Sequence, residues 1–190
     1  ETEDPSGSRT TGGRGDCLKW VRLSGGKDQD DLNTKLGQSI RVNERDVRSL
    51  IAVRDLIVFR RFLALLASRN GQVLNRSDFA APLGVSVPTV SSWLCVLETT
   101  GHIILVPPYF ENFGKRLIKS PEVYWGESGL LCFLLGIETD SELERSPFAG
   151  SVFEGFIASE IRNNRQNRGL SRDLYYFRDE QGLEVDFLLP

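Results

Sequence analysis

The feature that most constrains the fold is a pair of helical patterns joined by a glycine, between residues 77 and 99. The first pattern runs from about Ser77 to Leu83, and Gly84 follows it as a turn residue. Ser86 is placed to cap a second helix over about residues 87–99. One face of that second helix carries a stripe of apolar side chains, namely Val90, Trp93, Leu94 and Leu97. Two helices joined in this way predict a helix-turn-helix.

The segments on either side extend this pair into a winged helix-turn-helix domain over residues 41–125. Apolar residues recur at helical spacing over residues 41–55 and 56–69, which predicts two preceding helices. After the pair, the run Ile103 to Val106 is β-branched and aliphatic, and two further strand-like pieces follow at Leu117-Ile118 and Val123-Tyr124. Strands in this position predict a hairpin, or wing, with residues 112–116 at its tip.

The rest of the chain predicts a second, smaller domain over residues 126–190, so the fold class is α+β. Residues 128–135 and 150–164 have helical spacing, and residues 137–147 read as an acidic connector. The end of the chain reads as two strands, over 174–178 and 184–189. Residues 1–40 contain too few apolar side chains to bury a core, and we expect them to be disordered or foreign to the fold.

The composition excludes several classes of protein. The net charge of −3 gives no reason to expect a general nucleic-acid binder, which usually carries a basic surface. With a single histidine, a Cys/His zinc site is not expected. The three cysteines, Cys17, Cys95 and Cys132, are far apart, which favours reduced thiols and a cytoplasmic location. No apolar run is long enough to cross a membrane, so no membrane partner is expected.

The candidate nucleic-acid contacts lie mostly beside the second helix of the pair. From Gly84 to Leu97 there is no Arg, Lys, Asn or Gln, the side chains that read bases. Its outward face is neutral and consists of Pro88, Ser92, Cys95 and Thr99. We therefore expect phosphate contacts of low selectivity with DNA, or else a solvated basic face, or packing on another domain. The candidate contacts are Arg76, Thr89, Ser92, Lys115, Arg116 and Lys119.

Carboxylates near the C-terminus are the candidate metal ligands. Glu154 lies at the edge of the apolar stripe of the 150–164 helix, and Glu160 lies close to its centre. Glu184 and Asp186 project from the same side of the last strand. Because a carboxylate among apolar side chains must be paired or bound, Glu154, Glu160 and Asp186 could together bind magnesium. The alternative is a salt bridge from Glu160 to one of three arginines, Arg162, Arg165 or Arg178.

Short motifs in a fixed order along the chain point to a known family. They are Glu44-Arg45-Asp46-Val47, Leu83-Gly84-Val85-Ser86, Gly114-Lys115-Arg116-Leu117, Phe153-Glu154, Glu160-Ile161 and Glu184-Val185-Asp186. In this order they resemble the C-terminal domain of unknown function of prokaryotic AAA-type (P-loop) ATPases. The resemblance implies an ATPase module, then a winged helix, then a domain similar to the PD-(D/E)xK restriction-endonuclease fold.

The chain departs from that plan at both ends. It contains no Walker motif, so we expect no cofactor in this chain and ATP only in a missing N-terminal module. A nuclease of the implied fold needs an acid-x-Lys after its strand acid, and the chain ends four residues after Asp186. We therefore expect residues 126–190 to form an incomplete nuclease-like domain without activity of its own.

These observations lead to one main hypothesis and two alternatives. The chain is expected to be the C-terminal part of an ATP-binding protein of the AAA family, a non-catalytic module that contacts nucleic acid or protein. Its partners would be DNA phosphates, and the missing ATPase module or other subunits. The first alternative is part of a magnesium-dependent nuclease, with Glu154 or Glu160 and Asp186 as ligands. The second is a winged helix that docks on the ATPase itself.

Overall fold

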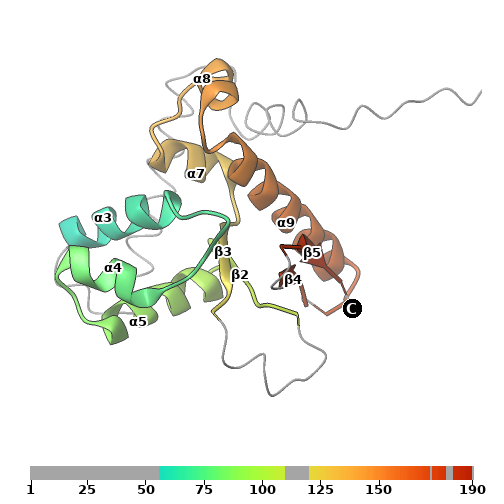
Figure 1. The fold of residues 1–190 in the computed structure, drawn as a ribbon, viewed down its shortest axis with the longest axis horizontal. Coiled ribbons are helices and arrows are strands. Elements are labelled where there is room, and N and C mark those ends of the chain that lie inside the picture. The colour runs from blue at the N-terminus through green and yellow to red at the C-terminus, as the bar shows by residue number, and fades with distance from the viewer. Residues whose placement is uncertain (1–55, 110–119, 172, 179–181, 190) are drawn as a thin grey trace, which may run out of the picture.

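The computed structural model describes residues 56–109, 120–171, 173–178 and 182–189, which form an α+β fold (Figure 1). Its elements in chain order are α3 (Leu56–Ala67), β1 (Gln72–Val73), α4 (Arg76–Leu83), α5 (Val87–Thr99), β2 (Ile103–Val106), β3 (Glu122–Trp125), α7 (Ser128–Leu134), α8 (Asp140–Arg145), α9 (Ala149–Asn167), β4 (Tyr175–Arg178) and β5 (Glu184–Leu188). The expected helix over 41–55, the strand at Leu117-Ile118, the wing tip at 112–116 and the segment 1–40 lie outside the described residues.

Helices α3, α4 and α5 pack together through aromatic side chains. Phe59 and Phe62 of α3 are fully buried because they recur on one face of that helix. Their rings lie 5.3 Å and 5.1 Å from the ring of Trp93 on α5. Phe62 also lies 5.9 Å from Phe79 of α4, ring centroid to centroid. Edge-to-face and tilted pairs of this kind stabilise a core beyond their apolar area alone.

The turn between α4 and α5 has the residues that the sequence predicts. Gly84 ends α4 in the left-handed conformation, with a φ of 65°, which a glycine adopts without steric cost. The Ser86 side chain accepts a hydrogen bond from the backbone N–H of Thr89 and so caps α5. The bounds predicted for α5 are confirmed. Among the described residues no single helix could cross a membrane; α4 and α5 meet that criterion only jointly, and they are bent by 116°.

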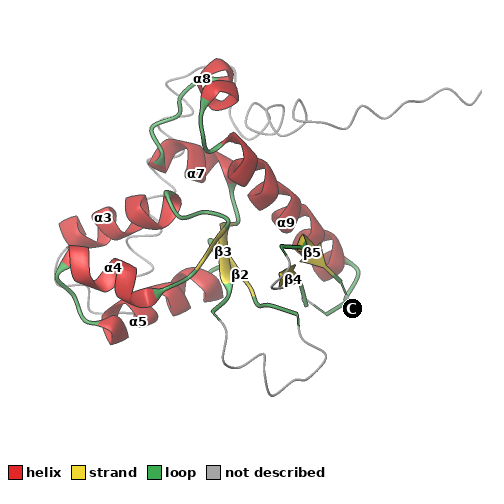
Figure 2. Cartoon of the chain, in the orientation of Figure 1, coloured by secondary structure: helices red, strands yellow, loops and turns green. Residues whose placement is uncertain are grey.

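The strands in the described part of the chain form two small antiparallel sheets. The first has the order β1-β3-β2, in which Ile104 of β2 lies opposite Tyr124 of β3. Strand β1 has two residues and no pattern that predicts it from the sequence. The second sheet is the hairpin of β4 and β5, and a parallel bridge between Pro108 and Tyr176 connects it to the chain that follows β2. Figure 2 shows the hairpin beside the first sheet, with α9 next to it.

The segment over 137–147, expected to be a connector, contains a helix. Helix α8 begins after Thr139, whose hydroxyl accepts a hydrogen bond from the backbone N–H of Glu142. The Glu142 carboxylate accepts a hydrogen bond from the Thr139 backbone N–H in return. This capping box satisfies two helix donors that would otherwise lack partners. The acidic connector expected here therefore contains a capped helix that the sequence analysis did not predict.

Helix α9 lies close to the first sheet through small residues. Gly155 and Ser159 are buried, and the Ser159 hydroxyl donates a hydrogen bond to the Gly126 carbonyl at 2.8 Å. A Cβ at Gly155 would lie 3.4 Å from Asn70 Nδ2 and 3.5 Å from the Trp125 carbonyl. One cluster of buried side chains runs from Phe59 to Val152, so the described residues share a core across position 125. The expected division at 125 stays a prediction.

Candidate functional site

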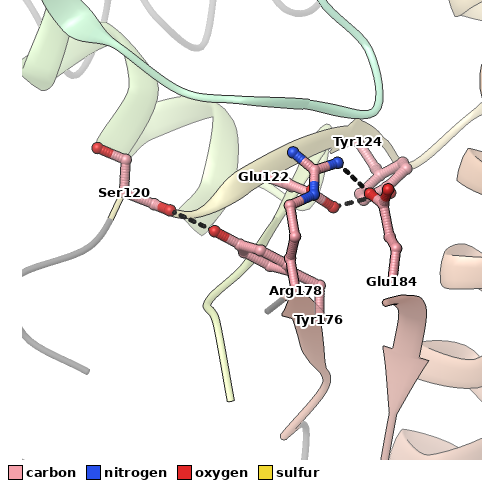
Figure 3. A network of polar contacts seen from close by, with 6 residues as sticks. All are labelled: Ser120, Glu122, Tyr124, Tyr176, Arg178 and Glu184. Carbon is pink, nitrogen blue, oxygen red and sulfur yellow. Dashed lines mark hydrogen bonds and ion pairs between the residues drawn. The ribbon is translucent and has the colours of Figure 1, made fainter. Parts of the chain in front are cut away.

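A buried carboxyl group begins strand β3. Glu122 is only 4% exposed, and the Tyr124 hydroxyl donates a hydrogen bond to its Oε2 at 3.1 Å (Figure 3). Burial raises the pKa of Glu122 from 4.5 to about 7, and the hydrogen bond from Tyr124 and the charge of Arg178 oppose that rise. The charges of Glu184 and Asp186 raise it further. Glu122 is therefore only partly ionised near pH 7.

The β4–β5 hairpin supplies the groups that face Glu122. The Tyr176 hydroxyl donates a hydrogen bond to the Ser120 carbonyl at 3.2 Å, and Arg178 forms an ion pair with Glu184 (Figure 3). The ring of Phe187 lies 5.4 Å from the ring of Tyr124. Polar and aromatic contacts thus hold the hairpin against the start of β3.

A fourth carboxylate comes from α9. Glu154 is half-buried, and burial raises its pKa, with further increases from the charges of Asp186 and Glu184. Burial also raises the pKa of the Tyr124 hydroxyl, and both Glu122 and Glu154 add to that rise. Four acids from β3, α9 and β5 therefore act on one another, and we call this set the acidic junction: Glu122, Glu154, Glu184 and Asp186.

Two acids of the junction, Glu122 and Glu154, have raised pKa values. Carboxylates that repel one another and are partly desolvated give up protons at a higher pH than isolated ones. A carboxyl group with a pKa of about 7 is half-protonated near neutral pH, so small changes in its surroundings change its charge. Within the described residues, no three Asp, Glu, His or Cys side chains form a group that could hold a metal ion. Magnesium binding stays a prediction from the sequence.

The predicted metal ligands separate in the structure. Glu154 and Asp186 both belong to the acidic junction, but Glu160 is exposed on α9. The expectation that Glu160 lies at the centre of a buried stripe was wrong, because α9 buries a face of small side chains. That face consists of Val152, Gly155, Ala158 and Ser159.

The three arginines proposed as partners of Glu160 have other contacts. Arg162 donates to the carbonyls of Gly101 at 3.2 Å and Ile103 at 3.5 Å. Arg165 donates to the Ser171 carbonyl at 2.7 Å, and Arg178 pairs with Glu184. The contacts of Arg162 connect α9 to the start of β2 and the turn before it, and those of Arg165 connect α9 to the loop that follows it.

The candidate nucleic-acid contacts are only partly described. Pro88, Ser92, Cys95 and Thr99 are exposed, which confirms the outward face predicted for α5. On that helix the Ser92 hydroxyl donates to the Pro88 carbonyl at 3.0 Å, and the Thr89 and Ser86 hydroxyls lie 2.8 Å apart. Lys115, Arg116 and Lys119 lie outside the described residues.

Arg76 is the one candidate cation that the described residues include. It is exposed in the first turn of α4. Burial raises the pKa of Glu98, and the charge of Arg76 opposes that rise. The charge of Arg76 therefore acts on Glu98, near the C-terminal end of α5.

Two residues of the acidic junction and its support were not singled out from the sequence. Glu122 is an acid at the start of a short strand, with no local pattern that marks it as buried. Asn70 reads as part of a helix stop before Gly71, yet it is 3% exposed. Its amide donates to the Ser151 carbonyl at 2.6 Å, and its oxygen accepts from the Trp125 N–H at 2.8 Å. Asn70 thus joins three elements, a role that only their packing shows.

Comparison with known proteins places the chain in a family. Residues 26–141, more than half of the chain, match the model of a domain of unknown function (DUF8612). The chain belongs to the DUF8612 family. Residues 149–190 match the model of a second domain of unknown function (DUF4143). The expected resemblance to a domain of unknown function is therefore confirmed at that level.

Curated relatives of this DUF8612 chain are uncharacterized proteins. One from Mycobacterium tuberculosis and one from Mycobacterium bovis are each 33% identical to it over 143 residues, which is 75% of this chain and 32% of the relative. The chain thus spans about a third of the length of the curated relatives it matches. No solved structure matches it significantly.

Proposed function

We propose that this chain is a non-catalytic interaction module of a larger ATP-binding protein of the AAA type, and that it contacts DNA phosphates with low sequence selectivity. The family match supports the first half, because DUF4143 is often found in AAA-ATPase contexts. The length of the mycobacterial relatives supports it too, since they have room for a further module.

The order of elements supports a winged helix as the contacting part. Helix α3 is followed by the short strand β1, the helix pair α4 and α5, and the strands β2 and β3. Strands β2 and β3 follow α5 and pair antiparallel, as the two strands of a wing would. In such a module the second helix of the pair and the wing are the parts that approach a duplex.

The observation that carries the proposal is the exposed outward face of α5. The buried stripe of Val90, Trp93, Leu94 and Leu97 fixes this face toward solvent. The face has hydroxyl groups and no cation, so it can approach a duplex but cannot read guanine or adenine by bidentate bonds. Affinity must then come from cations at its side, such as Arg76, which favours contacts with the phosphate backbone.

Fluorescence anisotropy with two labelled duplexes of unrelated sequence tests this proposal on the full chain. We expect similar affinities for both duplexes and a steep loss of affinity as salt rises, because binding releases counterions. Arg76→Ala should weaken binding to both duplexes equally and lower the salt slope by about 1. Combined replacement of Lys115, Arg116 and Lys119 with alanine should weaken it further.

A matched control is available on the far side of the molecule. Arg145 is an exposed arginine on α8, which Figure 1 shows at the opposite end from α5. Arg145→Ala removes the same charge and should leave the affinity within about twofold of the wild type, as for a residue that makes no phosphate contact. If neither duplex binds in a salt-dependent way, or if Arg145→Ala weakens binding as much as Arg76→Ala, the proposed DNA contact is wrong.

A further inference from the structure

The β4–β5 hairpin is joined to the first sheet by few backbone hydrogen bonds. The Tyr109 N–H donates to the Tyr176 carbonyl at 2.6 Å, and the Tyr176 N–H donates to the Pro107 carbonyl at 3.0 Å. This short parallel bridge is the only strand pairing between the two sheets in the described ranges. Side chains also hold the hairpin in place, among them the buried Leu174 and Tyr176, which pack in one cluster with Ile104 and Val106 of β2.

The side chains at this contact carry mainly negative charge when ionised. Within the described residues, Glu122 is influenced by Tyr124 on its own strand, by Arg178 on β4 and by two acids on β5. Tyr176 on β4 is influenced by Glu122 as well, and the charge of Glu154 of α9 acts on Tyr124. The two acids of β5 are Glu184 and Asp186, and Arg178 already pairs with Glu184.

A charge on Glu122 would therefore meet more acids than cations. Glu122 is buried between the sheet and the hairpin, so solvent cannot screen its charge as it screens an exposed one. When Glu122 is neutral, the remaining contacts are the hydrogen bonds and ring contacts that hold the hairpin in place.

We propose that the proton on Glu122 acts as a latch, so that the β4–β5 hairpin docks firmly on the sheet while Glu122 is neutral and loosens when Glu122 ionises. The latch responds to pH between about 4.5 and 7. It goes beyond the interaction with DNA, because it needs no nucleic acid.

The direction and size of the effect follow from linkage. In the docked state the pKa of Glu122 is about 7, whereas a solvated carboxyl has a value of 4.5. The docked state therefore binds the proton more tightly, and its advantage is full below about pH 4.5 and falls as pH rises to about 7. The docking equilibrium constant changes by up to about tenfold per pH unit in that window. Between about pH 5 and pH 8 we expect a loss of roughly 10- to 100-fold.

Amide hydrogen exchange on the full chain measures this docking directly. The reporters are the backbone amides of Tyr109 and Tyr176, because both donate across the bridge. Dividing each rate by that of an unstructured peptide at the same pH removes the intrinsic pH effect. We expect the protection of both amides in the wild type to fall with pH as above, and to remain below that of the α3 amides.

Three variants separate the latch from other causes. Glu122→Gln keeps the shape of the neutral side chain, so protection should lose its pH dependence. Tyr124→Phe removes the hydrogen bond that lowers the pKa of Glu122, so the fall should move to higher pH. Glu160→Gln, on the exposed side of α9, is the control and should behave as the wild type.

Several results would overturn the latch. Protection that does not change with pH would do so, and so would a pH dependence that Glu122→Gln retains. Protection equal to that of α3 at every pH would mean that the hairpin leaves only when the whole protein unfolds. If magnesium added at constant pH changes the protection of both amides equally in the wild type and in Glu122→Gln, a cation and not the proton controls the docking.

Discussion

Replacing Asn70 with alanine should weaken the attachment of α9 to the sheet. The Asn70 side chain is 3% exposed and bonds the Trp125 N–H at 2.8 Å and the Ser151 carbonyl at 2.6 Å. Asn70→Ala leaves the backbone N–H of Trp125 without its partner, which should cost about 1–3 kcal/mol of stability. It also removes the bond to Ser151, which contributes about 1 kcal/mol. The free energy of unfolding should therefore fall by about 2–4 kcal/mol.

Urea unfolding followed by circular dichroism measures this change. In thermal unfolding, the melting temperature should fall by roughly 5–15 °C, given the usual 2–4 °C per kcal/mol for a chain of this size. Asn164→Ala is the matched control, because Asn164 is exposed on α9, and it should change the stability by no more than about 0.5 kcal/mol. If Asn70→Ala is as stable as this control, Asn70 does not hold the three elements together.

Three other substitutions test separate parts of the structure. Glu122→Gln should match the wild type in stability at about pH 4 in urea unfolding. At about pH 8 it should be more stable than the wild type by about 1–3 kcal/mol. The upper value corresponds to the whole pKa shift of Glu122, and the lower value allows for solvent screening. Equal stabilities at both pH values would contradict the raised pKa of Glu122. Gly126→Ala places a Cβ 2.6 Å from the Gly101 carbonyl oxygen and should lower the free energy of unfolding by about 1–3 kcal/mol. The control is Gly150→Ala, whose Cβ would have no atom nearer than 4.0 Å and should not destabilise the protein. A harmless Gly126→Ala would show that the turn before β2 can move away. Thr139→Ala removes the cap of α8 and should lower the stability of that helix by about 1 kcal/mol, which faster amide exchange in α8 would show. Unchanged exchange would mean that the capping box does not stabilise the helix.

The helix pair could be predicted closely because several local signals agree there. Gly84 ends one helix, Ser86 caps the next, and the apolar stripe of α5 has the period of a helix. Each signal depends on residues within one or two turns, so long-range contacts do not change the outcome. The same holds for β2, whose β-branched run is visible without knowledge of its partners.

Elements whose signal is short or hidden were missed. Strand β1 has two residues and depends on pairing with Val123 and Glu122, which lie about fifty residues away in the chain. Helix α8 could have been found, because Thr139 and Glu142 have the spacing of a capping box. The acidic composition of that stretch masks this pattern.

The candidate site shows where periodicity alone fails. The large apolar residues of α9 predict a buried face that includes Glu160. In the structure the buried face contains the small residues Gly155 and Ser159 instead, because they allow α9 to pack closely against Gly126 and Trp125. The sequence predicts Glu184 and Asp186 on one face of the last strand, because side chains alternate between the two faces of any strand. Their approach to Glu122 depends on how the hairpin docks, and no local pattern encodes it.

A carbon-13 NMR titration of the Glu122 side-chain carboxyl tests most directly whether a protonated acid lies between the sheet and the hairpin. Its chemical shift should change with a midpoint near pH 7, as burial beside Glu184 and Asp186 requires. A midpoint near 4.5, the ordinary value, would mean that the carboxyl is solvated, and the acidic junction and its latch would then be wrong.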